Sequence, residues 1–397
     1  MPASPTPPDV NSARALTVAA HASFVPIGIV TVLLSPLLPT LAAKWALNYS
    51  QAGTLFTAQF LASTVAVFLS GVVVAQWGFR FAIKIGLALI AASVAGMLMG
   101  SRLLGMTCIA GYGAGLGLAV PAANLLVAEV NPGRRSSALN LLNFSWSAGA
   151  VACPFLVAAA AARDRVPLLL ALVAGFSLLV AAGITAMPSH ITEPRVSKAV
   201  AGNKAIRDWR QPSFAILAAL FFLYVGTENG FGGWVASYSK RLGTISATIA
   251  VMTPSFFYAS LMLGRCVAPL LLRRLEETRV VQGSLLLSCA GMAALVGSHT
   301  LLSVAVSATA AGLGLSVVYP ITISLLSRTF GAAASRIGSR MFACANLGGA
   351  FVPWAVGASS NRFGTLQAGL AVPLICSALM YVLYLRDWRS AAAEQPA

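Results

Sequence analysis

Long apolar runs separated by short polar stretches repeat along the whole chain. A run of about 20 apolar residues is long enough to cross a membrane as a helix. The run that follows Arg14 continues for nearly 30 residues, which is too long for a signal-peptide core, so we interpret it as a first span. The pattern predicts twelve spans, at 15–43, 51–76, 81–100, 103–129, 138–161, 167–187, 212–238, 245–272, 280–298, 301–326, 338–359 and 366–385.

The longest polar break, at 188–211, separates six predicted spans from six more. It predicts an all-α membrane protein of 12 transmembrane helices in two pseudo-symmetric six-helix bundles. The expected parts are a cytoplasmic tail (1–14), a first bundle (15–187), a cytoplasmic linker (188–211), a second bundle (212–387) and a second tail (388–397).

The composition supports this interpretation. Charged residues make up 9% of the 397 residues and apolar residues 58%, whereas soluble domains carry roughly 25% charge. The net charge of +16 could suggest a nucleic-acid partner, but the basic residues lie at span ends and not on one face with interleaved aromatic residues. We therefore expect no nucleic-acid binding.

The basic residues also predict an orientation. Of the 26, 18 fall on the side of the termini, 7 on the other side and one, Arg265, within a span. Because Lys and Arg gather in cytoplasmic loops, we expect a multi-pass protein of the cell (inner) membrane with both termini in the cytoplasm.

The sequence offers little for metal or enzyme chemistry. The six cysteines all lie in apolar runs without a Cys-x-x-Cys pair, and the three histidines are far apart. A Gly-Lys-Ser/Thr loop and the hydrolase motifs His-Glu-x-x-His and Gly-x-Ser-x-Gly are absent from the sequence. We expect no metal, no cofactor and no enzymatic activity.

Motifs of the first half recur in the second half at a spacing of 197 to 200 residues. Two related six-helix halves are typical of secondary transporters, whose site lies between the halves near the bilayer midplane. The matched pairs are Gly28 with Gly226, Gly115-Leu116-Gly117-Leu118 with Gly312-Leu313-Gly314-Leu315, Gly149-Ala150 with Gly349-Ala350, and Pro154 with Pro353.

The segment from Gly71 to Arg80 resembles the Gly-rich loop motif of the major facilitator superfamily, with Ala75 where the family has Asp. Within that superfamily the chain resembles the fucose permease-like branch of sugar:cation symporters. The segments that carry this second resemblance are Gln51-Ala52-Gly53, Ala122-Ala123-Asn124, Leu139-Asn140-Leu141 with Gly149-Ala150, Tyr224 to Glu228 with Trp234, Gly264-Arg265 and Tyr319-Pro320.

The resemblance implies transport of a sugar together with a cation, but the chain departs from the pattern of this branch in two spans. Proton symporters of this branch tend to carry carboxylates in spans one and four, where this chain has Ser35 and Val120. The coupling ion can therefore be a proton, bound by another acid, or sodium.

Glu228 is the one acid deep within an apolar run. An unpaired carboxylate there costs several kcal/mol or takes up a proton, and intramembrane acids are functional by default. We expect Glu228 to bind sugar hydroxyls or the co-transported proton, with a structural helix–helix hydrogen bond as the alternative. Four glycines flank it and would let the helix unwind or another backbone come close: Gly226, Gly230, Gly232 and Gly233.

Polar residues in several other spans are further candidates for the solute site. Asn140 and Asn143 share one helical face, which Trp146 borders. Amides both donate and accept hydrogen bonds, as sugar hydroxyls require, and an indole suits the apolar face of a pyranose. Interhelical hydrogen bonds are the alternative. The remaining candidates are Gln59, Asn124, Asn229, Trp234, Tyr319 and Asn346.

Three charged residues are candidates for gating. Glu129 at the end of span four precedes Arg134 and Arg135, which suggests a gating ion pair or a cap. Arg265 suggests a gating ion pair near the cytoplasm, or else an anion-binding group. Arg80 belongs to the loop motif, and the resemblance to the superfamily implies a gating role for it.

Together these features predict a secondary active transporter that moves a small polyhydroxylated solute, such as a monosaccharide, by alternating access. Its partners would be the solute, a co-transported proton or sodium ion and the lipid bilayer, and we expect a monomer. The alternative is a proton-coupled exporter of drugs or lipids. Drug/proton antiporters carry a Gly-rich Gly-Pro motif in span five, where this chain has Cys153-Pro154.

Overall fold

The structure, a computed structural model, describes residues 10–97, 101–188, 212–330 and 334–385. These residues form helices and no strand. Twelve helical segments are long and apolar enough to cross a membrane, which confirms the predicted twelve-span, all-α fold. Most of the predicted tails and of the linker at 188–211 lies outside the described residues.

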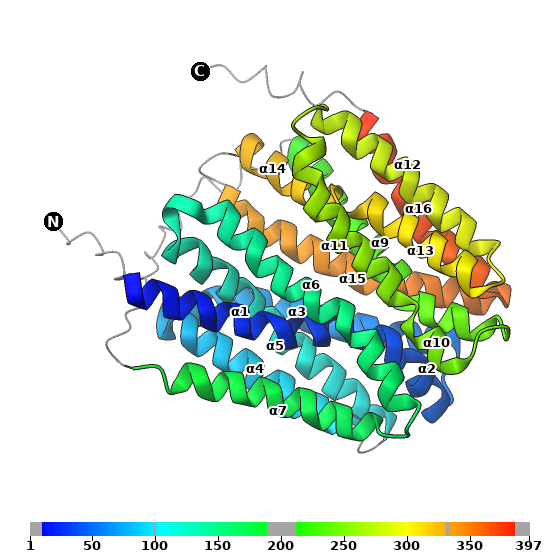
Figure 1. Ribbon diagram of the computed structural model, residues 1–397, viewed down its shortest axis with the longest axis horizontal. Helices are drawn as coiled ribbons and strands as arrows, with labels where there is room; N and C mark the ends of the chain where they lie inside the picture. The colour runs from blue at the N-terminus through cyan, green and yellow to red at the C-terminus, as the bar shows by residue number, and fades with distance from the viewer. Residues whose placement is uncertain (1–9, 98–100, 189–211, 331–333, 386–397) are drawn as a thin grey trace. The chain divides into compact units, whose positions relative to one another are not determined.

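The described residues form two compact units. The first unit holds residues 10–33 and 58–188, and the second holds 34–57 and 212–385. In the first unit α1 packs on α6, while α4 packs on α5 and α7 (Figure 1). The helices of this unit are α1 (Val10–Val32), most of α3 (Tyr49–Trp77), α4 (Phe79–Gly96), α5 (Arg102–Val130), η1 (Pro132–Arg134), α6 (Arg135–Ala161) and α7 (Val166–Thr185).

The second unit repeats this arrangement. The main contacts are those of α9 with α15 and of α12 with α13. Its helices are α2 (Leu34–Lys44), α9 (Pro212–Arg241), α10 (Ala247–Met252), α11 (Pro254–Leu271), α12 (Glu277–Val296), α13 (Leu301–Leu315), α14 (Val318–Phe330), α15 (Ala334–Phe363) and α16 (Leu366–Leu385).

Three of the predicted spans are each built from two helices, and a proline explains every break. Proline lacks the N–H that would bond the carbonyl four residues earlier, and its ring collides with that carbonyl. Pro36 and Pro320 therefore interrupt the chain near Val32 and Ser316. At the third break Pro254 frees the Ala250 carbonyl, and the Thr253 hydroxyl donates to it at 2.7 Å.

Glycines let helix backbones touch in both units. A methyl group at Gly149 of α6 would collide with the Val25 carbonyl of α1, and one at Gly348 of α15 would collide with the Phe222 carbonyl of α9. Close approach of this kind stabilises helix pairs in membranes, because lipid tails remove the hydrophobic gain that packing brings in water. These glycines fix how α1 meets α6 and how α9 meets α15.

The same contacts refine the internal repeat. Gly113 lies against the Gln59 carbonyl of α3, and Gly312 against the Phe257 carbonyl of α11. Likewise, Gly115 meets α4 and Gly314 meets α12. The equivalent residues are therefore 199 apart, as Pro154 and Pro353 are. The spacing of 197 that the sequence suggested for this motif is two residues too short.

Residues 34–57, which the sequence assigns to the first bundle, pack within the second unit. The Ser35 hydroxyl donates to the Gly232 carbonyl at 2.5 Å, and the Thr57 hydroxyl donates to the Ala350 carbonyl at 3.1 Å. The Phe56 ring lies 6.4 Å from the Trp234 ring. These contacts hold α2 and the first turns of α3 against α9 and α15.

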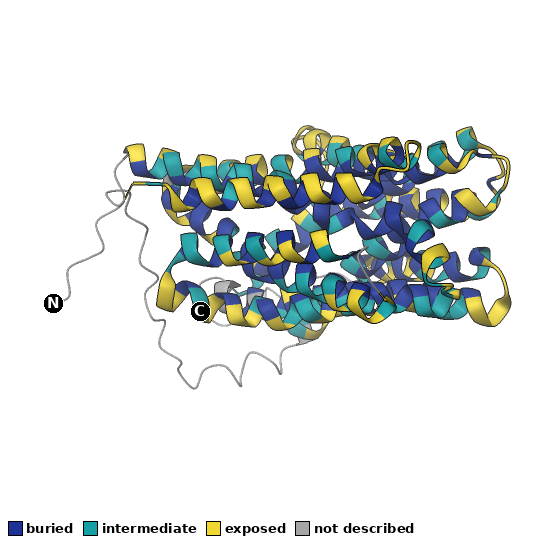
Figure 2. Ribbon diagram, turned by 90° about the horizontal axis from the view of Figure 1, so that it is seen from below, coloured by how far each residue is buried: buried dark blue, intermediate teal, exposed yellow. Residues whose placement is uncertain are grey.

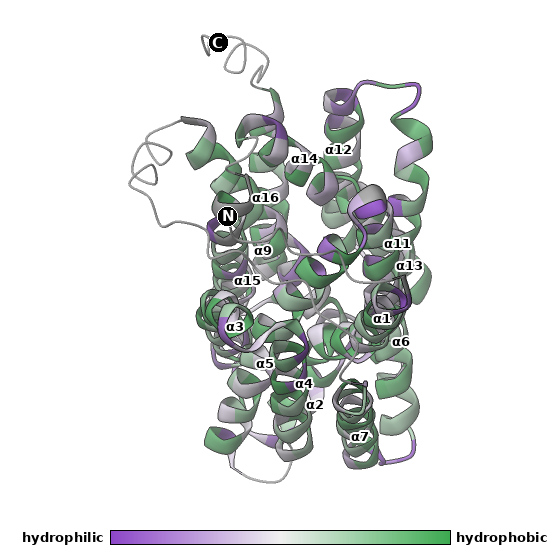
Figure 3. Cartoon of the chain, turned by 90° about the vertical axis from the view of Figure 1, so that its left-hand side faces the viewer, coloured by the Kyte–Doolittle hydropathy of each residue, from purple (hydrophilic) through white to green (hydrophobic). Residues whose placement is uncertain are grey.

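The outer faces of the helices are apolar. Figure 2 shows exposed positions along one side of many helices and buried positions along the other, and Figure 3 shows that most of the helical surface is hydrophobic. Large apolar side chains such as Leu179 and Leu302 are 69% and 74% exposed. Exposed apolar surface on this scale needs a lipid solvent, so the chain is a multi-pass membrane protein.

The glycine contact between α9 and α15 gives a first prediction. We expect Gly348→Ala to lower the free energy of unfolding by about 1–3 kcal/mol, because the added methyl overpacks the contact with the Phe222 carbonyl. Gly283→Ala on α12 is the matched control, since nothing lies within 4 Å of its added methyl. Unfolding of detergent-purified protein, followed by tryptophan fluorescence, measures both. Equal unfolding of the two variants would contradict the packing argument.

Candidate functional site

Glu228 lies near the middle of α9, which runs unbroken from Pro212 to Arg241. The glycines around it admit neighbouring side chains and do not unwind the helix. Gly226 and Gly230 lie against Val352 of α15, and Gly233 lies against Phe56. Of the two possibilities that the sequence left open for this Gly-rich segment, the structure shows close approach.

Tyr224, one turn before Glu228, links it to the basic residue of the membrane region. The Arg265 guanidinium on α11 donates from Nη2 to the Tyr224 hydroxyl at 3.1 Å. Glu228 lies one turn further along α9, close enough to interact electrostatically with both Arg265 and the Tyr224 hydroxyl. The three side chains therefore form a continuous polar connection between α9 and α11.

Tyr319 of α14 completes this cluster. Its ring lies 5.2 Å from the Tyr224 ring at an angle of 30°, and the Phe221 ring packs edge-on against it at 5.8 Å. The Tyr319 hydroxyl also contributes to the electrostatic surroundings of Arg265. We call Tyr224, Glu228, Arg265 and Tyr319 the charged cluster.

Most of the charged cluster reaches accessible surface. Glu228, Arg265 and Tyr319 are half-buried, while Tyr224 is 1% exposed. Three of its four residues are therefore partly accessible, and the fourth accepts the hydrogen bond from Arg265. The structure bonds Arg265 to Tyr224, and its gating role near the cytoplasm, with anion binding as the alternative, stays a prediction.

The first unit holds a neutral counterpart around α1. The Gln59 amide donates to the Thr31 carbonyl at 3.3 Å and accepts from the Tyr112 hydroxyl at 3.1 Å. The Trp146 indole donates to the Thr31 hydroxyl at 3.3 Å. Gln59 is 2% exposed, so in this conformation its amide serves packing between helices. Sequence reasoning missed Tyr112, although it is the one tyrosine in the Gly-rich run of span four.

The asparagines predicted to bind solute are more accessible. Asn140 and Asn143 are exposed, and Asn124, Asn229 and Asn346 are half-buried. In three of them the amide donates at 2.9 Å to the carbonyl four residues earlier in the same helix, a bond that uses one N–H of each: Asn124 to Val120, Asn143 to Leu139 and Asn229 to Val225.

Trp234 is placed differently from these asparagines. It is 1% exposed, donates to the Pro353 carbonyl at 2.9 Å and packs between the rings of Tyr49 and Phe56. Burial leaves its ring no face for a solute in this conformation. Solute binding by Trp234 stays a prediction about another state of the protein.

The remaining gating candidates lie at helix ends. Glu129 pairs with Arg135 at 3.5 Å, with about half of each side chain exposed (50% and 54%), so the pair is worth only about 0–1 kcal/mol. Arg80 donates to the carbonyls of Ile184 at 3.1 Å and Met187 at 2.9 Å. It thereby satisfies carbonyls at the C-terminal end of α7, and its gating role stays a prediction.

Known proteins resemble the chain over most of its length. The sequence pattern of the Major Facilitator Superfamily matches residues 21–353. A glucose/galactose transporter of Brucella abortus is 24% identical over 371 residues, which cover 88% of this chain and 89% of that protein. The glucose/mannose transporter GlcP of Bacillus subtilis is 27% identical over 145 residues, covering 36% of this chain and only 35% of GlcP.

Solved structures share the fold. A variant of the nucleoside transporter NupG superposes with a TM-score of 0.76 at 14% identity, covering 94% of this chain and 98% of its own. A D-xylose–proton symporter gives 0.73 at 16% identity (92% and 97% covered), and the E. coli fucose:proton symporter FucP gives 0.66 at 18% (93% and 97%). The chain belongs to the Major Facilitator Superfamily, as its twelve spans and internal repeat predict.

Proposed function

We propose that the protein is a secondary active transporter that carries a monosaccharide across the inner membrane by alternating access, coupled to a proton or sodium gradient. The proposed substrate class rests on the similarity to the Brucella glucose/galactose transporter over 88% of the chain. The excess of basic residues on the side of the termini supports cytoplasmic termini.

The charges of the cluster favour a neutral solute. The Glu228 carboxylate and the Arg265 guanidinium balance each other across Tyr224. The Glu228 carboxylate would repel an anionic solute that approached Arg265, whereas hydroxyl groups can hydrogen-bond to both side chains. The anion-binding role that the sequence left open for Arg265 is therefore disfavoured.

Glu228 is the group we assign to coupling. Among the described residues it is the one acid in the interior of a span. Ser35, at a place where proton symporters of the sugar branch carry an acid, donates its hydroxyl to the Gly232 carbonyl and cannot accept a proton in its place. Proton binding at Glu228 would change the charge balance of the cluster at the point where the solute binds.

Alternating access requires that one end of the transporter opens. In the second unit, Ser35, Thr57 and Phe56 hold α2 and the start of α3 against α9 and α15. We propose that these contacts separate during the cycle, which would also expose the ring of Trp234.

Solute flux tests the proposal directly. We expect the full chain in proteoliposomes to accumulate at least one of glucose, galactose, mannose and fucose when a proton or a sodium gradient is imposed separately, because the gradient supplies the driving force. Protein-free liposomes are the control. If no sugar moves under either gradient while drug or lipid export is detected, the alternative function takes precedence.

Glu228→Gln tests the coupling role. We expect this variant to lose gradient-driven accumulation and its pH dependence, since an amide cannot carry the proton, and to keep exchange of solute between the two sides. The matched control is Glu276→Gln, which makes the same change at an exposed ion pair with Arg279 (3.6 Å). Full accumulation with unchanged pH dependence in Glu228→Gln would exclude a proton role for this carboxylate.

A double-mutant cycle tests the pairing in the charged cluster. We expect Glu228→Gln and Arg265→Gln each to lower the unfolding temperature, and the double variant to lose less than the sum, with a coupling of about 1–3 kcal/mol. The reason is that either single change leaves the opposite charge without its partner. Strict additivity would show that the two charges do not interact.

A further inference from the structure

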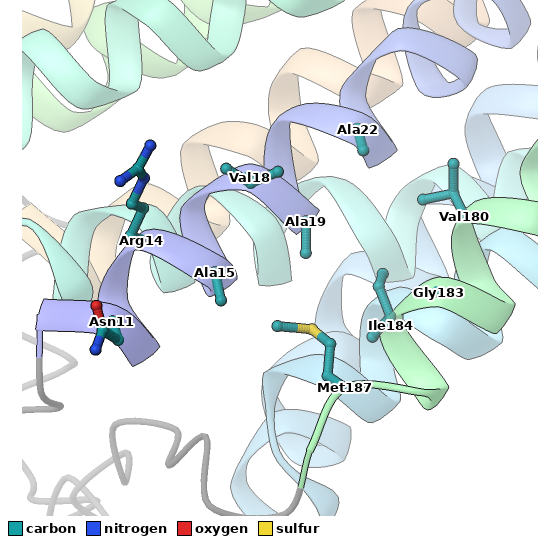
Figure 4. Close-up of a pocket in the computed structure, with 10 residues that line it drawn as sticks. All are labelled: Asn11, Arg14, Ala15, Val18, Ala19, Ala22, Val180, Gly183, Ile184 and Met187. Atoms are coloured by element: carbon teal, nitrogen blue, oxygen red, sulfur yellow. The ribbon is translucent and has the colours of Figure 1, made fainter.

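A groove lies between α1 and α7 in the first unit, at the end where the described chain begins (Figure 4). Its volume is about 510 Å³, and its walls are the ends of two membrane spans, α1 and α7. The residues that line it are Asn11, Arg14, Ala15, Val18, Ala19 and Ala22 of α1, and Val180, Gly183, Ile184 and Met187 of or just beyond α7.

Small residues keep the groove open. Ala15 and Ala19 point from α1 toward Ile184 and Met187 in Figure 4. On the other wall, Gly183 is exposed, and nothing lies within 4 Å of where its side chain would begin. The groove is thus an open surface of the first unit that is lined mainly by hydrocarbon.

The charges around the groove have one sign. Arg14 is exposed and lines the groove, and in Figure 4 its guanidinium points outward from α1, away from Ile184 and Met187. Arg80 is not a lining residue, but its guanidinium donates to the carbonyls of Ile184 and Met187, which are. The lining contains no acidic residue. This end also faces the side that carries most of the basic residues, where a membrane leaflet holds anionic lipids.

We infer that the groove binds one anionic phospholipid from the leaflet on the side of the termini. An acyl chain lies along Ala15, Ala19 and Gly183, and the phosphate lies within reach of Arg14. Hydrocarbon lining selects a lipid tail over a polar ligand, and the Arg14 guanidinium selects an anionic headgroup over a zwitterionic one. The inference concerns the first unit alone and does not depend on the transported solute.

The experiment counts bound lipid. The full chain is delipidated in detergent and titrated with phosphatidylglycerol or with phosphatidylcholine, and native mass spectrometry follows the first lipid bound. We expect phosphatidylglycerol to bind more tightly than phosphatidylcholine. Arg14→Gln should weaken the binding of phosphatidylglycerol about fivefold and leave that of phosphatidylcholine unchanged, because a basic residue near an anionic lipid contributes about that factor.

A second experiment fills the groove with a larger side chain. We expect Gly183→Leu to weaken binding of the first phosphatidylglycerol molecule about tenfold, which is the factor for losing roughly two buried methylene groups. Gly175→Leu is the matched control on the same helix, because Gly175 is also exposed, has nothing within 4 Å and lies outside the groove. Equal affinity for the two lipids in the unmodified chain, or the same loss in both leucine variants, would overturn the inference.

Discussion

Backbone contact through glycine is the constraint on which the rest of this structure depends. Lipid solvates an apolar helix about as well as a neighbouring helix does, so packing must come from close approach. Gly149 against Val25 sets the α1–α6 pair, and Gly348 against Phe222 sets the α9–α15 pair. On α9, Gly226 and Gly230 instead admit the Val352 side chain of α15, which fixes the rotation of the helix. Glu228 is therefore held on a defined face of α9 by its neighbours in sequence.

The duplicated scaffold carries different chemistry in its two copies. At the spacing of 199 residues that the glycine contacts define, Arg265 corresponds to Ala66, and Tyr319 corresponds to Val120. The first copy uses neutral groups: Tyr112 donates to Gln59, and Gln59 and Trp146 both donate to Thr31. The second copy carries the charges and leaves them half accessible. On the proposed function, the first copy can supply amides to a solute, whereas the second copy supplies the titratable groups.

The sequence predicted the spans and the repeat and singled out Glu228 as an acid within a span, because each of these depends on composition and position along the chain. It could not pair Glu228 with Arg265, since the two lie on different helices and their rotation is set by packing. Burial of Gln59 and Trp234 escaped prediction for the same reason: a polar or aromatic residue on a helix looks the same in sequence whether it faces a cavity or a neighbour. The breaks at Pro36 and Pro320, in contrast, follow from local stereochemistry and were open to prediction.

On the proposed function, the tyrosine between the two charges matters more than either charge alone. The Tyr224 hydroxyl accepts from Arg265, which leaves its one proton free to point toward the nearby Glu228 carboxylate. If Glu228 takes up a proton, it no longer needs that donor, and the Tyr224 hydroxyl is free to turn toward another acceptor. A sugar hydroxyl close to Arg265 can then take the place of the carboxylate. Proton binding and solute binding would favour each other through one shared hydroxyl, and by linkage each must strengthen the other equally.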